Sequence, residues 1–115
     1  MREFLRTMVT GATPADIREA NPRWSDADID AEMAGFAHFD VALLDTAPDS
    51  AADYLPGPPA RPSLVQLADP SLTIPPEAAA ELERRGYQLH TVPGTGHCIH
   101  RDDLEGFLRS LDGWI

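Results

Sequence analysis

The chain has 115 residues, 43% of them apolar, so it has the length of one ordinary domain and enough hydrophobic material for a core. Its 19 acidic and 9 basic side chains give a formal charge of −10, which makes nucleic acid an unfavourable partner. No apolar run approaches the roughly 20 residues of a membrane span, and the N-terminus lacks the apolar core of a signal peptide, so we expect a cytoplasmic globular protein without a membrane partner.

Helix signals dominate residues 1–46. A short helix is predicted near Arg2–Val9, where apolar side chains recur on one face. Residues 13–16, Thr-Pro-Ala-Asp, offer an N-cap, a first-turn proline and an acidic third residue, and they predict the start of a second helix. This helix should stop before Asn21-Pro22, because proline cannot continue it. Trp24 follows and is expected to be a packing anchor between helices.

The start signal is repeated at residues 25–28, Ser-Asp-Ala-Asp. Ile29, Met33 and Phe36 then recur at i, i+4 and i+7, which places them on one face of a third helix. Residues 40–46 predict a short fourth helix. This half of the sequence carries no strand pattern, so it is expected to be helical throughout.

Proline interrupts the next segment. Five prolines fall between residues 47 and 62 and prevent regular main-chain hydrogen bonding there: Pro48, Pro56, Pro58, Pro59 and Pro62. The segment is predicted to be a linker or an ordered crossing loop.

Residues 63–115 alternate between strand and helix signals. Residues 63–68 form a mostly apolar run that predicts a buried strand, and residues 88–92 predict a second one. Between them a helix is predicted from Pro75-Pro76 to Gly86, a residue suited to the left-handed conformation at a helix end. The expected core face of a closing helix consists of Leu104, Phe107, Leu108 and Leu111.

This order and its short connections predict an α/β fold with a right-handed parallel βα unit. Two parallel strands alone do not make a stable sheet, because such sheets are covered on both faces and need neighbours along their edges. We therefore expect the open strand edge to be covered by another polypeptide or by a second copy of the chain.

The stretch GTGHCIHRDD, residues 94–103, follows the second predicted strand. In α/β sheets, sites form at the carboxyl ends of the strands, where both Asp69 and His97 are expected. Gly94 and Gly96 would let the chain turn sharply and expose the His97 imidazole. Cys98 is expected to be a buried small hydrophobe, since a single cysteine forms no internal disulfide.

These residues resemble the C-terminal part of the α/β-hydrolase fold. VPGTGHCIHRDDLEGFLRSLDGWI, residues 92–115, is similar to the ending in which the last strand leads into a P-G-x-G-H turn with the catalytic histidine. RPSLVQLADPS, residues 61–71, looks like the preceding strand, which ends at the catalytic acid. The resemblance implies three parts: a helical lid over residues 1–46, a linker over 47–62, and a βαβα part of the hydrolase core over 63–115.

The resemblance also implies a chemistry. His97 would be the general base of a serine hydrolase and Asp69 the acid that orients it, in agreement with the family's order of serine, acid, histidine along the chain. The reaction would be hydrolysis of a small-molecule ester or related carbonyl compound, without a cofactor. Met33 and Phe36 of the lid, together with His100, are the residues expected to touch the substrate.

The sequence departs from the family in two respects. It contains no Gly-x-Ser-x-Gly nucleophile motif, so the nucleophile is expected on a missing N-terminal hydrolase half and the chain alone should be inactive. The family's Gly-x-x-Asp pattern places Ser71, not Asp69, at the acid position, and Asp45 is a weaker substitute.

Two alternatives remain open. The chain could be a noncatalytic binding or assembly protein that keeps a hydrolase scaffold. It could instead bind a metal through His97 and His100 with His90 or Asp102, although this spacing matches no recognised ligand pattern.

Overall fold

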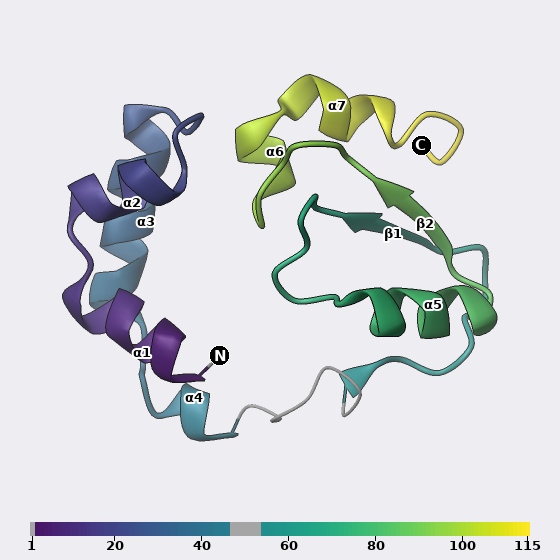
Figure 1. The fold of residues 1–115 in the computed structure, drawn as a ribbon, viewed down its shortest axis with the longest axis horizontal. Coiled ribbons are helices and arrows are strands. Elements are labelled where there is room, and N and C mark those ends of the chain that lie inside the picture. Colours follow the sequence, from purple (N-terminus) through teal and green to yellow (C-terminus); the bar gives the residue numbers. More distant parts are fainter. Residues whose placement is uncertain (1, 47–53) are drawn as a thin grey trace. The chain divides into compact units, whose positions relative to one another are not determined.

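The computed structural model describes residues 2–46 and 54–115. The chain divides into two compact units, residues 1–47 and 48–115, and each is described by itself (Figure 1). Most elements in the described part are helices, and two parallel strands alternate with helices in a βαβ-like unit. None of the helices described in either unit has the length and apolar character needed to cross a membrane.

The N-terminal unit is helical, as predicted. Its helices are α1 (Arg2–Gly11), α2 (Pro14–Ala20), α3 (Asp26–His38) and α4 (Leu43–Thr46). Helix α3 packs against α2 and α1, and α1 also packs against α4. The side chains buried in this unit are those of Ile17, Trp24, Ile29 and Leu44. The burial of Trp24 in the turn between α2 and α3 agrees with its expected role as a packing anchor.

Both predicted helix starts are confirmed as capping boxes. The main-chain N–H of Thr13 donates to the Asp16 carboxylate at 2.7 Å, and the Thr13 hydroxyl accepts from the Asp16 main-chain N–H. Ser25 and Asp28 repeat the arrangement at the start of α3, with the Ser25 N–H 3.0 Å from the Asp28 carboxylate. Each box satisfies N–H groups that have no partner inside the helix.

The C-terminal unit contains the sheet. Its elements are β1 (Leu64–Leu67), α5 (Pro76–Arg84), β2 (Gln88–Thr91), α6 (Ile99–Asp102) and α7 (Leu104–Arg109). The strands pair in parallel, with Leu64 opposite Gln88 and Leu67 opposite Thr91, which confirms the predicted orientation. Within this unit the strands lie between α5 on one side and α6 and α7 on the other (Figure 1).

Helix α5 ends as predicted, at a glycine in the left-handed region. Gly86 has a φ of +99°, and its N–H donates to the Glu83 carbonyl at 3.0 Å. The N–H of Tyr87 reaches back to the Leu82 carbonyl at 3.1 Å, which completes a Schellman motif. The motif turns the chain directly from α5 into β2.

The prediction for the core face of the closing helix was wrong for two residues. Leu104 is 59% exposed and Leu108 is 51% exposed, whereas Phe107 packs against the cluster of Ala68, Val92 and Ile99. Leu104 and Leu108 are one helical turn apart and therefore share the outward face of α7.

Small residues set this orientation of α7. Gly106 is buried, and a Cβ added to it would lie 3.1 Å from Cγ1 of Val92, so the helix backbone packs directly on the sheet. Ser110 is also buried, and its hydroxyl bonds to the Gln66 amide as well as to the Phe107 carbonyl at 2.7 Å. A periodicity of large apolar residues does not reveal a face built from glycine and serine.

Part of the proline-rich segment is bound to the end of α5. The Arg85 guanidinium donates to the carbonyls of Leu55, at 3.1 Å, and Pro56, at 2.6 Å, and the Tyr87 hydroxyl donates to that of Gly57 at 2.9 Å. Residues 55–57 are thus an ordered loop, while residues 47–53 of the predicted linker lie outside the described residues.

Candidate functional site

Asp69 and His97 lie beyond the carboxyl ends of the two parallel strands. Asp69 follows the last residue of β1 by two positions, and His97 follows the last residue of β2 by six. The main-chain N–H of Asp69 donates to the carbonyl of Thr95 at 2.9 Å. The structure therefore joins the loop after β1 to the loop that leads to His97.

The loop before His97 is also fixed from within. Gly94 has a φ of +66°, the sharp turn that its glycine predicted, and its N–H lies 3.4 Å from the Asp69 carboxylate. Thr95 is 1% exposed, and its hydroxyl donates to the Val92 carbonyl at 2.7 Å. Asp69 thus holds this loop twice, through its backbone and through its side chain.

Gly96 is held from the other side by helix α6. Its N–H donates to the Asp102 carboxylate at 2.6 Å, and a Cβ on Gly96 would lie 3.0 Å from the same oxygen. The φ of Gly96 is not positive, and its lack of a side chain allows this close approach of the Asp102 carboxylate. The Thr95–Gly96 peptide is therefore anchored at both its carbonyl and its N–H.

The His97 side chain itself is exposed. Within the described part of the chain, no hydrogen bond or ion pair joins its imidazole to Asp69, which is also exposed. The arrangement is a fixed backbone that carries a free imidazole. Chemically, this group can accept or donate a proton for a molecule that approaches the strand ends.

His100 lies in α6 and is exposed. Its ring meets that of Phe107 edge to face, with centroids 5.9 Å apart and planes at 63°. Across residues 2–46 and 54–115, no three histidine, cysteine or acidic side chains come together in a group that could hold a metal ion. The geometry gives no support to the metal alternative. Cys98 is half-buried just before α6.

Asp45, the weaker acid candidate, and Ser71 have local structural contacts. Ser71, at the family's acid position, accepts the main-chain N–H of Ile74 at 3.1 Å and stabilises a turn. Asp45 lies in α4 of the N-terminal unit and forms an ion pair with Arg6 at 2.8 Å. Neither contact indicates a role in catalysis.

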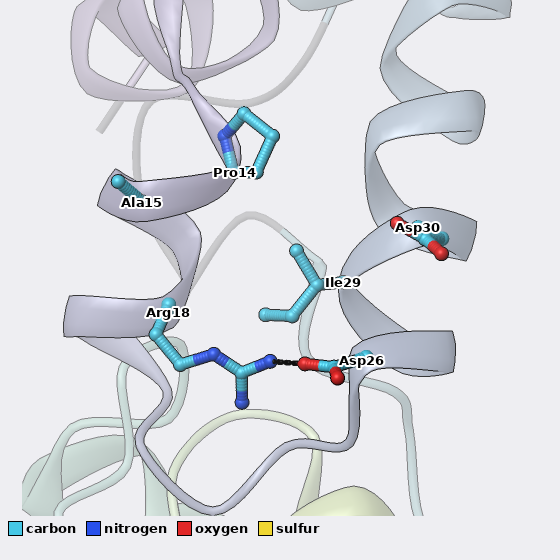
Figure 2. A pocket seen from close by; sticks show the side chains of 6 residues that line it. All are labelled: Pro14, Ala15, Arg18, Asp26, Ile29 and Asp30. Atoms are coloured by element: carbon cyan, nitrogen blue, oxygen red, sulfur yellow. Dashed lines mark hydrogen bonds and ion pairs between the residues drawn. The ribbon is translucent and has the colours of Figure 1, made fainter.

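Met33 and Phe36 are half-buried in α3. The same unit contains an open hollow of about 320 Å³ between α2 and α3, which neither residue lines (Figure 2). Figure 2 shows Arg18 of α2 reaching across to Asp26 of α3. Arg18 also donates to the Trp24 carbonyl, so the hollow is closed at one end by an internal cross-link.

Sequence reasoning missed the residues that anchor the site loop, Thr95 and Asp102. For Thr95, its position between the two glycines of the turn was the available signal, and Asp102 had none. Their partners are main-chain groups, however, which side-chain patterns do not specify.

No protein-family model, no curated protein and no solved structure matches this chain. The resemblance to α/β hydrolases therefore rests on the motifs in residues 62–115.

Proposed function

We propose that this chain is the C-terminal portion of an α/β hydrolase and supplies the catalytic histidine, His97, to a serine on another polypeptide. The observation that carries the proposal is the 2.9 Å main-chain bond between Asp69 and Thr95. It brings the loops of the acid and base candidates together at the carboxyl ends of parallel strands, where sites in α/β sheets form.

His97 would act first as general base. It takes the proton of the partner's serine hydroxyl while the serine oxygen attacks the carbonyl carbon of an ester. It then gives this proton to the departing alkoxide, which leaves as an alcohol while the acyl group stays on the serine as an acyl-enzyme. His97 next takes a proton from a water molecule, whose oxygen attacks the acyl carbon, and returns this proton to the serine oxygen, which releases the acid and restores the serine.

The anchored backbone supports this role. The Thr95–Gly96 peptide is held at its carbonyl by Asp69 and at its N–H by Asp102, so little ordering of the backbone is needed when a substrate binds. The free imidazole remains available to a hydroxyl group from outside the chain.

Asp69 is the candidate acid. Its side-chain bond to the Gly94 N–H is long, at 3.4 Å, and therefore weak. The carboxylate can leave it at small cost and turn to the imidazole, while the main-chain bond to Thr95 keeps the loops together. For the substrate we propose a small ester with an apolar acyl or aromatic group, contacted in the C-terminal unit by His100.

Ester turnover by the complex tests this function. The tagged chain is expressed in its native organism, purified with whatever binds it, and assayed with a p-nitrophenyl ester, beside His97→Ala and the exposed-histidine control His90→Ala. We expect turnover in the wild type and the control and its loss in His97→Ala. Equal turnover in all three, or none with the folded wild type, would reject the proposal.

One observation favours a second candidate, a noncatalytic binding or assembly protein. The Asp69 carboxylate accepts the N–H of Gly94, so in the folded chain it stabilises the loop and does not orient the His97 imidazole. This candidate requires that His97→Ala complement a deletion of the gene as well as the wild type does. A growth defect specific to His97→Ala would exclude it.

A further inference from the structure

One edge of β1 carries main-chain groups that point away from β2. The N–H of Gln88 donates to Ser63 and that of Val92 to Leu67. In a parallel pair, alternate residues bond to the same neighbour, so Leu64, Gln66 and Ala68 face the other way. No residue described in 54–115 bonds to the main chain of these three, which we call the outer edge of β1.

The burial of the side chains is typical of an interior strand for β1 and of an edge strand for β2. Every side chain of β1 is half-buried or buried, whereas Gln88, His90 and Thr91 of β2 are exposed. Strands with neighbours on both sides are typically apolar on both faces. The next outward position after β2 is Pro93, which has no N–H and shortens that edge. A further strand is therefore expected beside β1.

We propose that the occupant is a second copy of this chain, paired antiparallel along the outer edge of β1. In an antiparallel pair, facing residues exchange both hydrogen bonds. In the register centred on Gln66, Gln66 of one copy lies opposite Gln66 of the partner subunit, and Leu64 lies opposite Ala68 of the partner subunit. The result is a four-stranded mixed sheet with a twofold axis at Gln66, in which the same surface serves both copies.

The prolines agree with this register. Pro62 lies two residues before the outer edge, and Pro70 lies two residues after it, in the bend that follows β1. In the register centred on Gln66, both prolines lie just beyond the ends of the ladder. Neither residue has an N–H to donate, so the ladder ends without leaving a donor unpaired at either end.

Charge favours the antiparallel direction over the parallel one. Arg61 and Asp69 are exposed and lie at opposite ends of β1. Arg61 has no ion pair within residues 54–115, and in the centred register it is diagonal to Asp69 of the partner subunit, within reach of its long side chain. Two such pairs, related by symmetry, oppose the repulsion between two acidic chains. Parallel pairing would instead bring the two arginines together.

Sedimentation velocity over a range of concentrations, combined with amide hydrogen exchange, tests the dimer on the purified chain. We expect the mass of two chains at high concentration. The Leu64 and Gln66 amides should then exchange more slowly as the dimer fraction rises, while those of Leu89 and Thr91 on the other edge do not change. A monomer at every concentration, or a dimer that leaves Leu64 and Gln66 unprotected, would overturn the proposal.

Matched variants locate the interface. Leu64→Pro removes an outward N–H without touching the bonds to β2 and should abolish the dimer, whereas Thr91→Pro makes the same change at the opposite edge and should not. Arg61→Glu should weaken the dimer more than Arg84→Glu, which changes the charge equally. Dimerisation of Leu64→Pro to the same extent as the wild type would show that the outer edge of β1 is not the interface. If Leu64→Pro does not fold, the amide hydrogen exchange of Leu64 and Gln66 in the wild type tests the interface. The dimer is tested on the purified chain alone and the hydrolase role on the co-purified complex, so the failure of one proposal is distinguishable from the failure of the other.

Discussion

The main-chain N–H of Asp69 donates to the carbonyl of Thr95 at 2.9 Å, so the loop after β1 and the loop before His97 form one structure. Thr95 also bonds through its hydroxyl to Val92, which continues the ladder with β1 through Leu67. The position of the His97 backbone thus depends on polar contacts within these loops, of which the buried Thr95 hydroxyl bond can be removed by a single substitution.

Thr95→Val should lower the free energy of unfolding of the C-terminal unit by about 1 kcal/mol, because it removes a buried hydroxyl bond while the shape of the side chain is kept. Urea titration followed through the NMR signals of residues 88–111 measures the change. Thr91→Val, at an exposed site in β2, is the control and should have no comparable effect. An equal loss in both variants would show that the Thr95 hydroxyl bond is not the cause.

Gly106→Ala should destabilise the C-terminal unit by about 1–3 kcal/mol, because it overpacks the contact between α7 and the sheet. The new Cβ would lie 2.2 Å from Oδ2 of Asp103 and 3.1 Å from Cγ1 of Val92. Asp103 could turn away only by giving up its 2.8 Å cap on the Gly106 N–H.

Gly35→Ala is the contrasting helix substitution. Nothing lies within 4 Å of a Cβ added there, so the variant should stabilise the N-terminal unit by about 0.5–1 kcal/mol through helix propensity. Thermal unfolding by circular dichroism compares the two variants. A Gly106→Ala protein as stable as the wild type would contradict the packing described for α7.

The capping box of α2 should make the N-terminal unit sensitive to acid. Two hydrogen bonds lower the pKa of the Asp16 carboxyl below its ordinary value of 3.8: the one from the Thr13 hydroxyl has the larger effect, and the one from the Thr13 main-chain N–H the smaller. The folded state therefore favours the charged carboxylate of Asp16. The contribution of this carboxylate to stability is complete above pH 3.8 and is lost as the pH falls through its lower pKa in the folded state.

Helix content followed by circular dichroism from about pH 5 to about pH 2 measures the effect, and Asp16→Asn should show a smaller loss on acidification. The other carboxylates titrate alike in both proteins, so the difference between the curves reports Asp16. Superimposable curves would contradict the role given to this carboxylate.

Arg85→Ala should release the loop at residues 55–57, because it removes charged donors from the carbonyls of Leu55 and Pro56. Opening of this loop should become easier by about 1.5 kcal/mol, and chymotrypsin cleavage after Tyr54 about tenfold faster. Arg84→Ala, which removes only an exposed partner of Glu81, is the control. Cleavage at the same rate in both variants would show that Arg85 does not hold the loop.

Local signals predicted much of the fold. The capping boxes at Thr13 and Ser25 and the glycine end of α5 depend on residues a few positions apart, and all three are as expected. The parallel pairing followed from the order of the elements. The face of α7 was missed because it depends on Gly106 meeting Val92, a contact between distant parts of the chain.

The candidate site was predictable only in its outline. The positions of Asp69 and His97 beyond the strand ends follow from the strand pattern, but the contact of the Asp69 carboxylate with the Gly94 peptide does not. Main-chain partners carry no residue-specific signal, so the anchoring of the loop by Thr95 and Asp102 could be seen only in three dimensions.

Mass analysis after treatment with a fluorophosphonate probe tests most directly whether His97 activates a serine on another polypeptide. The purified chain and the complex it forms in its native organism are treated in parallel, each as wild type, His97→Ala and His90→Ala. We expect no adduct on the chain itself, and a serine adduct on the co-purified polypeptide that is lost only with His97→Ala. An adduct on this chain, a partner adduct that survives His97→Ala, or no adduct on any polypeptide would contradict it.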